Sequence, residues 1–288
     1  MSVRSAAVWC AAFLALGCSP SEFPCASDEA CVQDGAAGVC QSTGYCSFPD
    51  EECPSRQRYV EHAPAELSEA CVDSSWGLVG RWALDDGAGL TARDDSGNGR
   101  DGSLVRDPSW TSGIFGGALE FAGEGRRVEV GIDGFGTSSI SGSAWVKSTD
   151  DRPVTARIIG SAFRDDQYFF IDFKTGYPSL GAKSAESEYW DCNTEGVFIG
   201  DGAWHELGFI IDRAANESRF YMDGVVERRC PRDPVTETTF GDRAEQSLFM
   251  IGAQNDTDAL SFVGTVDAVA LWARALEDAE MAVLGQKP

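Results

Sequence analysis

Beyond residue 76 the chain consists largely of short runs in which apolar and polar positions alternate. Alternation with a period of two places every second side chain on one face of a strand, so each run predicts a half-buried β-strand. Such runs occur at residues 78–84, 118–121, 127–130, 141–146, 157–161, 168–173, 179–182, 196–199, 205–212, 217–222, 225–229, 247–251 and 262–271.

Clusters of turn-forming residues separate these runs. Residues 94–99 read Asp-Asp-Ser-Gly-Asn-Gly, and Asp223-Gly224 is a pair that suits a two-residue hairpin. A helical pattern is confined to residues 276–284, with acidic positions early and apolar positions late. Many short strands with frequent turns predict an all-β, antiparallel sandwich.

The first residues have the pattern of an export signal. Arg4 is followed by an apolar stretch, residues 6–16, which is too short to span a bilayer. We therefore assign residues 1–17 to a signal peptide and expect the protein to be exported. No other stretch approaches the ~18 apolar residues that a transmembrane helix needs.

The end of this signal, residues 14–18, reads Leu-Ala-Leu-Gly-Cys and resembles a bacterial lipobox. The resemblance implies that Cys18 carries a diacylglycerol after cleavage and that residues 18–23 form a lipidated tether. Ser19 implies, by analogy with lipoprotein sorting, passage to the outer membrane, facing either the periplasm or the cell surface. An ordinary signal peptide cut near the same place is the alternative.

Residues 24–75 have a different composition, rich in Cys, Asp, Gly and Ser and poor in apolar residues. A segment of this length and composition cannot bury a sufficient core without cross-links. Its cysteines are Cys25, Cys31, Cys40, Cys46, Cys53 and Cys71. We therefore expect a small disulfide-rich segment ahead of the sandwich.

The cysteine count supports this expectation. Ten cysteines are encoded, and eight remain when Cys10 is removed with the signal peptide and Cys18 is lipidated. In an oxidising compartment we expect three bridges within the segment and a fourth between Cys192 and Cys230. Six cysteines allow fifteen pairings, and the sequence does not choose among them. A zinc site is the alternative, disfavoured because paired C-x₂-C units are missing and His62 is the nearest histidine.

The sequence has a formal net charge of −23. Such a surface repels nucleic-acid phosphates and anionic bilayers, so we expect no nucleic-acid partner and membrane contact through the lipid alone. The charge serves solubility outside the cell or, where carboxylates cluster, binding of Ca²⁺, which prefers oxygen ligands.

An ordered set of motifs resembles a known family. The segments are WALDDGAG (82–89), DDSGNGRDG (94–102), GGALEF (116–121), SAWVK (143–147), DGAWH (201–205), FYMDG (220–224) and VDAVALWARAL (266–276). Together they resemble the laminin G-like jelly-roll family within the concanavalin A-like lectin/glucanase fold. The resemblance implies that residues 76–288 form a jelly-roll sandwich. The chain departs from the pattern at Ala268 and in residues 184–194, an acidic and aromatic stretch that we expect to be a loop.

The resemblance also implies a structural calcium, because family members often hold one where the opening loops meet the closing strand. The candidate ligands are Asp85, Asp94, Asn98, Asp101 and Asp267. Asp/Asn-Gly loops offer the side-chain and carbonyl oxygens that Ca²⁺ requires. The alternative is that these side chains make only the hydrogen bonds of turns.

The aromatic residues fall into two groups. Those in strand patterns are expected in the core, namely Trp82, Trp145, Trp204 and Trp272. Tyr189 and Trp190 instead lie beside Cys192 in the expected loop, which a bridge to Cys230 would hold rigid. This pair is our candidate for exposed stacking on a sugar, and a structural role is the alternative.

Catalytic patterns are weak. Retaining glycosidases of the wider fold need two carboxylates about 5 Å apart, and the nearest candidates, Glu186, Glu188 and Asp191, lie in the expected loop rather than on alternate strand positions. With only His62 and His205 in the chain, no Ser/His/Asp set is apparent. We therefore expect a protein that is not an enzyme.

Taken together, the sequence predicts a cell-surface or envelope lipoprotein. Its lectin-like domain is expected to recognise a glycan or a surface protein, with Ca²⁺ as the only expected cofactor. A structural or adhesion component without a small ligand is the alternative, and a glycoside hydrolase of the same fold is a weaker one. Fold alone does not decide between them.

Overall fold

The structure is a computed structural model. It describes residues 24–26, 30–33, 35–41, 43–50, 53, 57–72, 77–132, 138–161, 168–183, 189–194, 196–231, 247–254 and 260–288. The chain forms two compact units, Met1–Val72 and Asp73–Pro288. The predicted signal peptide, Cys18 and the tether lie outside the described residues, as do Glu186 and Glu188. Among the described residues, no helix has the length and apolar character needed to cross a membrane.

The first unit consists of short strands held by cross-links. Its strands are β1 (Val32–Gln33), β2 (Ala36–Ala37), β3 (Val39–Cys40), β4 (Cys46–Pro49) and β5 (Gln57–Tyr59). β3, β4 and β5 form a three-stranded sheet. Disulfides join Cys25 to Cys40, Cys31 to Cys46 and Cys53 to Cys71. The three predicted bridges are confirmed, and the disulfides take the place of the zinc alternative because a bridged sulfur is not a thiolate ligand.

The interior of this small sheet is partly polar. Gln41 donates to the hydroxyl of Ser47 at 2.7 Å, and Ser47 donates to Gln57 at 2.9 Å, with all three side chains buried. The apolar cluster beside them is small, with Tyr59, Ala63 and Val72 as its buried members. Each bridge closes a loop of 15 to 18 residues. Such closure contributes ~3 kcal/mol in the chain-entropy model, which offsets the small core.

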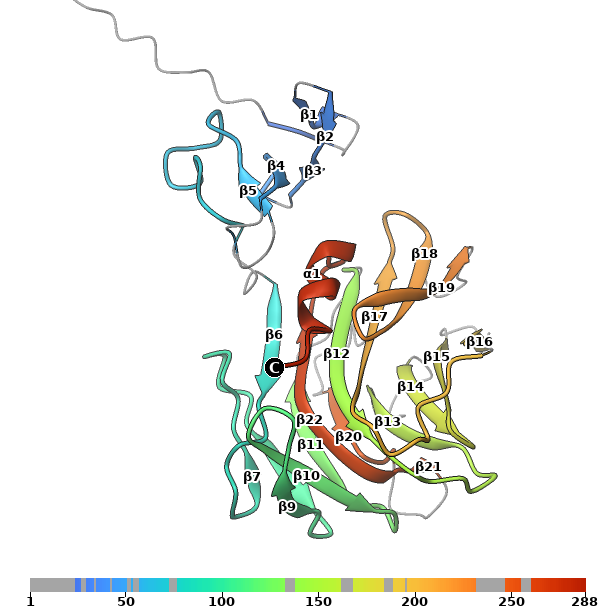
Figure 1. The fold of residues 1–288 in the computed structure, drawn as a ribbon. Helices are drawn as coiled ribbons and strands as arrows, with labels where there is room; N and C mark the ends of the chain where they lie inside the picture. The colour runs from blue at the N-terminus through green and yellow to red at the C-terminus, as the bar shows by residue number, and fades with distance from the viewer. Residues whose placement is uncertain are drawn as a thin grey trace, which may run out of the picture. The chain divides into compact units, whose positions relative to one another are not determined.

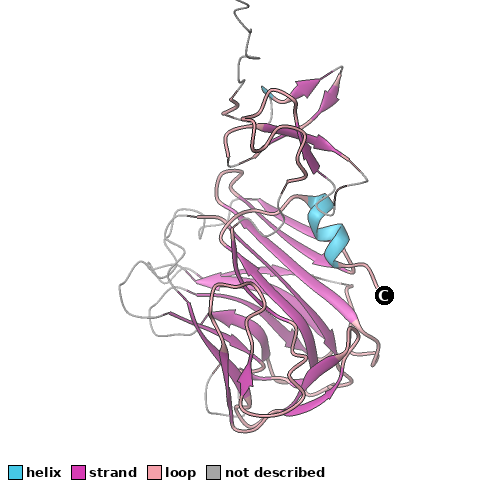
Figure 2. Cartoon of the chain, turned by 90° about the vertical axis from the view of Figure 1, so that its left-hand side faces the viewer, coloured by secondary structure: helices cyan, strands magenta, loops and turns pink. Residues whose placement is uncertain are grey.

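The second unit contains two large sheets (Figures 1 and 2). The eight-stranded sheet has the order β19-β18-β17-β12-β22-β10-β9, with β6 also paired to β22. Its strands are β6 (Leu78–Trp82), β9 (Ser109–Ser112), β10 (Gly117–Ala122), β12 (Ile140–Lys147), β17 (His205–Asp212), β18 (Glu217–Met222), β19 (Val225–Pro231) and β22 (Val263–Trp272).

The nine-stranded sheet has the order β16-β15-β14-β13-β20-β11-β8-β7, with β21 paired to β13. Its strands are β7 (Thr91–Ala92), β8 (Gly102–Val105), β11 (Arg127–Ile132), β13 (Ala156–Ser161), β14 (Tyr168–Lys174), β15 (Tyr177–Lys183), β16 (Tyr189–Asn193), β20 (Ser247–Ile251) and β21 (Leu260–Ser261). All pairs are antiparallel except β13 with β21. The predicted all-β antiparallel sandwich is confirmed.

The core lies between the two sheets and is rich in aromatic rings. Phe169 of the nine-stranded sheet meets Phe209 of the eight-stranded sheet with ring centroids 5.4 Å apart, and Trp82 stacks on Phe249 at the same distance. These side chains are almost fully buried. Burying an aromatic side chain stabilises the folded state by ~1.5–3 kcal/mol relative to leaving it exposed. The apolar side chains that the two sheets turn toward each other therefore hold the sandwich together.

A terminal helix, α1 (Asp278–Leu284), covers part of the outer side of the eight-stranded sheet (Figure 1). It begins with a capping box in which Glu277 and Glu280 satisfy each other's backbone N–H groups. Met281 packs with Tyr221 and Trp272, and Trp145 donates its indole N–H to the carbonyl of Leu284 at 3.2 Å. The helix predicted at residues 276–284 is therefore confirmed.

One disulfide joins the two sheets at one side of the sandwich. Cys192 lies in β16 and Cys230 in β19, and these are the terminal strands of their sheets. The fourth predicted bridge is thus confirmed.

Two local predictions were wrong. Residues 196–199 form no strand; Val197 and Ile199 alternate because they are buried against the core from an irregular segment. Within the loop expected at residues 184–194, Tyr189–Asn193 forms strand β16, because pairing with β15 outweighs the low strand propensity of its acidic and amide residues.

Candidate functional site

A hollow of about 580 Å³ lies where β14, β15 and β16 run side by side. In β14, Phe169, Ile171 and Phe173 belong to the core, so the alternate positions Asp172 and Lys174 lie on the face turned away from it. We call this the outer-face hollow. Its lining residues are Thr155, Asp172, Lys174, Thr175, Tyr177, Pro178, Ser179, Asp191, Asn193, Thr194 and Gly196.

The strand register fixes the floor of the outer-face hollow. Asp172 lies opposite Ser179, and Ser179 lies opposite Asn193, so these three polar residues form one row across the strands. The next row is Phe170, Gly181 and Asp191. Because both rows lie on strands paired in one antiparallel ladder, the backbone that carries these polar groups is in place before any ligand arrives.

A buried ion pair supports this floor. The Arg157 guanidinium contacts the Asp172 carboxylate, with Nε to Oδ1 at 2.5 Å, and both side chains are almost fully buried. The guanidinium also lies 4.0 Å from the ring centroid of Phe170. The Phe170 ring lies over Gly181, where an added Cβ would come within 2.3 Å of the ring. Arginine, aromatic ring and glycine therefore hold Asp172 in one orientation.

Asp191 lies near this ion pair on the neighbouring row. Burial raises the pKa of its carboxyl group, and the negative charge of Asp172 raises this pKa further. The carboxylates of Asp172 and Asp191 therefore both act on the same end of the outer-face hollow. The Asp172 carboxylate is paired with Arg157.

Two exposed aromatic rings stand at the other end. Tyr177 and Phe198 are 47% and 46% exposed, and their rings meet edge to face with centroids 5.4 Å apart. Phe198 packs on Gly176, whose φ is +85° and where an added Cβ would come within 2.0 Å of the ring. A glycine is thus required both by the turn and by the ring. The exposed pair forms a fixed aromatic surface beside polar groups.

The predicted ligand-binding residues lie close by in the sequence. Tyr189 and Trp190 are the first two residues of β16, opposite Lys183 and Ala182 of β15. Their side chains lie outside the described part of the structure, so their role stays a prediction. Asp191 and Asn193 of the same strand line the outer-face hollow.

The predicted calcium ligands separate into two groups. In the first, Asp94 accepts backbone N–H bonds from Arg81, Ser96 and Arg100 at 2.9–3.1 Å. Burial acts to raise the pKa of the Asp94 carboxyl, but hydrogen bonds from Ser96, Arg100 and Arg81 outweigh it and the pKa is lowered.

Asn98 and Asp101 belong to the same loop. Asn98 donates its amide N–H to the carbonyls of Leu78 and Val79, and Asp101 accepts from the backbone N–H of Asp94 at 2.9 Å. With Asp94 saturated by N–H donors, these three side chains fit the turn interpretation better than the calcium interpretation.

Asp85 and Asp267 form the second group. Asp267 Oδ2 accepts N–H bonds from Ile114 and Phe115 at 2.8 and 3.0 Å, and Asp85 Oδ1 accepts one from Gly117. The Oδ1 atom of Asp267 is buried and has no hydrogen-bond partner.

The carboxylates of Asp85 and Asp267 also interact electrostatically. Burial raises the pKa of Asp267, its backbone hydrogen bonds oppose that rise, and the charge of Asp85 adds to it. An unpartnered buried oxygen beside a second carboxylate is a feature that a cation would satisfy, so this group fits part of a calcium site.

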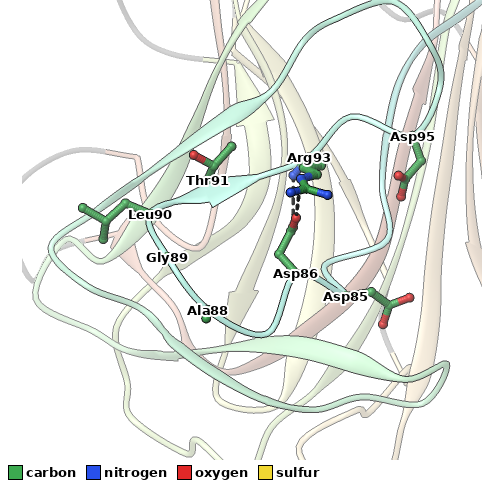
Figure 3. Close-up of a pocket in the computed structure, with 8 residues that line it drawn as sticks. All are labelled: Asp85, Asp86, Ala88, Gly89, Leu90, Thr91, Arg93 and Asp95. Carbon is green, nitrogen blue, oxygen red and sulfur yellow. Dashed lines mark hydrogen bonds and ion pairs between the residues drawn. The ribbon is translucent and has the colours of Figure 1, made fainter.

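A second hollow, of about 470 Å³, lies within the loop after β6 (Figure 3). We call it the loop hollow; its lining residues are Asp85, Asp86, Ala88, Gly89, Leu90, Thr91, Arg93 and Asp95. Arg93 and Asp86 form an ion pair at 3.3 Å across it, and the Arg93 side chain is 78% exposed. Thr91 of β7 lies at one wall, and the other lining residues belong to the loop. Asp86 holds this loop through the exposed ion pair and by accepting the backbone N–H of Arg93 at 3.1 Å.

The sequence also matches a known superfamily. A model of the concanavalin A-like lectin/glucanases superfamily matches residues 122–282, more than half of the chain. The chain belongs to this superfamily. The matched region contains the outer-face hollow and Asp267, whereas Asp85 and the Asp94 loop precede it. The expected family is confirmed, although the resemblance was expected to begin at residue 76.

Binding domains are among the solved structures of similar fold. They include the binding domain of Paraclostridial Mosquitocidal Protein 1 (16% identity, TM-score 0.60, covering 73% of this chain and 52% of that one). Domain 4 of an extracellular arabinanase from Geobacillus stearothermophilus, in complex with arabinotriose, has 21% identity and a TM-score of 0.56, covering 73% and 98%.

A third is the botulinum neurotoxin serotype D ligand binding domain in complex with N-acetylneuraminic acid, with 11% identity, a TM-score of 0.58 and coverage of 73% and 51%. The match thus spans about half the length of both toxin chains. At these identities the likeness concerns the fold alone. No curated protein matches the chain by sequence.

Within this superfamily fold, sequence reasoning missed most of the outer-face hollow. Asp172 gave a readable signal, since it is the one charged residue in the apolar run 168–173. Tyr177 and Phe198 gave none, because they are 21 positions apart and meet only through the fold.

Proposed function

We propose that this chain is an envelope lipoprotein whose sandwich binds a carbohydrate at the outer-face hollow and does not catalyse its cleavage. The observation that carries the proposal is the exposed Tyr177 ring beside a polar hollow. Sugars present C–H faces that pack on aromatic rings and hydroxyl groups that need hydrogen-bond partners. The outer-face hollow offers both in a fixed arrangement.

The composition of the lining supports this proposal. Ser179, Asn193 and Thr155 supply hydroxyl and amide groups, and Asp191 supplies a carboxylate. Carbohydrate ligands of two similar domains, arabinotriose and N-acetylneuraminic acid, are consistent with such a role. Both apolar and polar groups are needed because binding must compensate for the water that the sugar loses.

The placement of the carboxylates favours binding over hydrolysis. Asp172 is engaged by Arg157 and almost fully buried in the floor, which leaves Asp191 as the exposed carboxylate of the described lining. A glycosidase needs two carboxyl groups that both reach the scissile bond. The described residues of the outer-face hollow do not offer such a pair.

We further propose that Cys18 carries the lipid and that the protein resides at the outer membrane. The support is the lipobox-like stretch at residues 14–18 and the four disulfides, which require an oxidising compartment. Mass spectrometry of the N-terminal peptide is expected to find an acylated Cys18; an unmodified Cys18 would contradict the anchor.

A structural Ca²⁺ is a second proposal, at Asp85 and Asp267. Their carboxylates would hold the ion, and Ca²⁺ would offset the repulsion by which the charge of Asp85 raises the pKa of Asp267. Asp94, Asn98 and Asp101 are not included, because their hydrogen bonds already satisfy them.

The experiment that tests carbohydrate binding is a glycan array with the mature protein, with and without Ca²⁺. The Tyr177→Ala variant is expected to lose at least tenfold in affinity for any glycan that binds, since truncating a central aromatic residue of a binding site costs about 2 kcal/mol or more and about 1.4 kcal/mol is tenfold. Val225→Ala is the matched control, because Val225 is 61% exposed on the eight-stranded sheet. Equal binding by wild type and Tyr177→Ala would contradict the site, and binding of surface proteins but no glycan would favour the protein-partner alternative.

A further inference from the structure

The two ends of the outer-face hollow differ in charge. At one end, Lys174 lies opposite Tyr177 at the turn between β14 and β15. At the other end, Asp191 lies opposite Gly181, four residues farther along β15. At the rise of a strand this is about 13 Å from the Lys174 end. A sugar on Tyr177 that extends along the strands therefore approaches Asp191.

Among the side chains that the structure describes, the Asp191 end carries an excess of negative charge. Asp172 and Asp191 contribute two carboxylates, whereas Arg157 is the guanidinium paired with Asp172. Among the described residues, no ion pair of Asp191 is found. The raised pKa of Asp191 reflects the cost of a further negative charge beside Asp172 in a partly desolvated place.

We infer that the outer-face hollow selects saccharides without acidic groups, and that Asp191 sets this selection by accepting hydrogen bonds from sugar hydroxyls. The inference rests on the proposed carbohydrate binding. An ionised carboxylate is an acceptor only, with two oxygens that match a pair of neighbouring hydroxyl donors.

An acidic sugar at the same place would bring a third carboxylate to Asp172 and Asp191. Like charges in a partly buried site repel strongly, and such repulsion is a common source of specificity. The chemistry of this end therefore fits a neutral chain such as arabinotriose, the ligand of the similar arabinanase domain, and opposes N-acetylneuraminic acid, the ligand of the similar neurotoxin domain.

The test uses the mature protein and matched pairs of glycans that differ by one N-acetylneuraminic acid. Wild type is expected to bind the neutral member at least tenfold more tightly than the sialylated member. Asp191→Asn keeps the shape and removes the charge, so it is expected to bind the neutral glycan about tenfold more weakly and to narrow the preference between the members by a similar factor.

The control is Asp107→Asn, since Asp107 is an exposed aspartate between β8 and β9, away from the hollow in the sequence and in the strand order. It removes the same charge from the chain and is expected to change neither affinity. An intact Cys192–Cys230 bridge, measured by peptide mass mapping, checks that β16 is still in place.

The outcomes separate this inference from the proposed function. Equal binding of neutral and sialylated members by wild type, or an unchanged preference in Asp191→Asn, overturns the inference and leaves carbohydrate binding intact. Absence of binding to every glycan overturns both.

Discussion

The two hollows of the sandwich differ in what holds their walls. In the outer-face hollow, paired strands, a buried ion pair and glycine-supported rings fix each side chain. In the loop hollow, a solvated ion pair crosses a loop. Volume alone therefore does not identify a binding site. The outer-face hollow is the better candidate because its groups are arranged before a ligand arrives.

The largest expected difference between the two hollows comes from their arginines. Arg157→Ala removes one partner of a buried pair and is expected to destabilise the protein by about 3–5 kcal/mol, because Asp172 is left without its partner in a place where burial already raises the pKa of its carboxyl group. Arg93→Ala breaks an exposed pair and is expected to cost less than ~0.5 kcal/mol. Urea unfolding of both variants measures the difference, and equal losses would contradict the contrast.

A smaller effect is expected at Asp94, which organises the loop that carries the loop hollow. Its carboxylate accepts N–H bonds from Ser96 and Arg100, so Asp94→Ala is expected to cost about 1–2 kcal/mol at neutral pH. The folded pKa of Asp94 is lowered. Its contribution is therefore complete above the unfolded value of 3.8 and is lost as the pH falls through the folded value.

Unfolding of wild type and Asp94→Ala between about pH 3 and pH 7 tests this dependence. The difference between the two stabilities is expected to narrow toward the acid end. A constant difference would mean that the loop is held by something other than the ionised carboxylate.

The fold was largely readable from the sequence, and the outer-face hollow was not. Strands β10, β12, β14 and β17 form where the alternating runs predict them, although β12, β14 and β17 are buried on both faces rather than on one. Alternation failed at residues 196–199, where Val197 and Ile199 are buried without strand pairing. Local sequence contains no information on which segments pack beside such a loop.

The candidate site depends on contacts between distant segments. Strand β16 was missed because it is short and contains Asp191 and Asn193, residue types that are depleted in strands, so that pairing with β15 decides its conformation. The calcium candidates show the same limit. Five residues of suitable chemistry were predicted together, yet the fold divides them between the Asp94 loop and the Asp85–Asp267 group.

The smallest expected effect is the response of the two groups of calcium candidates to Ca²⁺. Millimolar Ca²⁺ is expected to stabilise the protein by about 1 kcal/mol, as for weak extracellular sites, and chelation is expected to reverse it. Asp267→Asn is expected to abolish the rise in Tm, and Asp94→Asn to retain it. Because the pKa of Asp267 is raised, protons compete with the ion and the rise should grow with pH.

Thermal unfolding with Ca²⁺ and with a chelator measures these shifts. Loss of the shift in Asp94→Asn but not in Asp267→Asn would reverse the assignment of the two groups. No shift in the wild type would remove the calcium proposal.

A crystal structure of the mature protein with a neutral oligosaccharide that it binds tests most directly which hollow receives the ligand, the outer-face hollow or the loop hollow. We expect a sugar ring packed on Tyr177, with hydroxyl groups of the sugar hydrogen-bonded to Asp191 and Asn193. A sugar seated between Asp86 and Arg93, with the surface of β14 to β16 free of ligand, would contradict it.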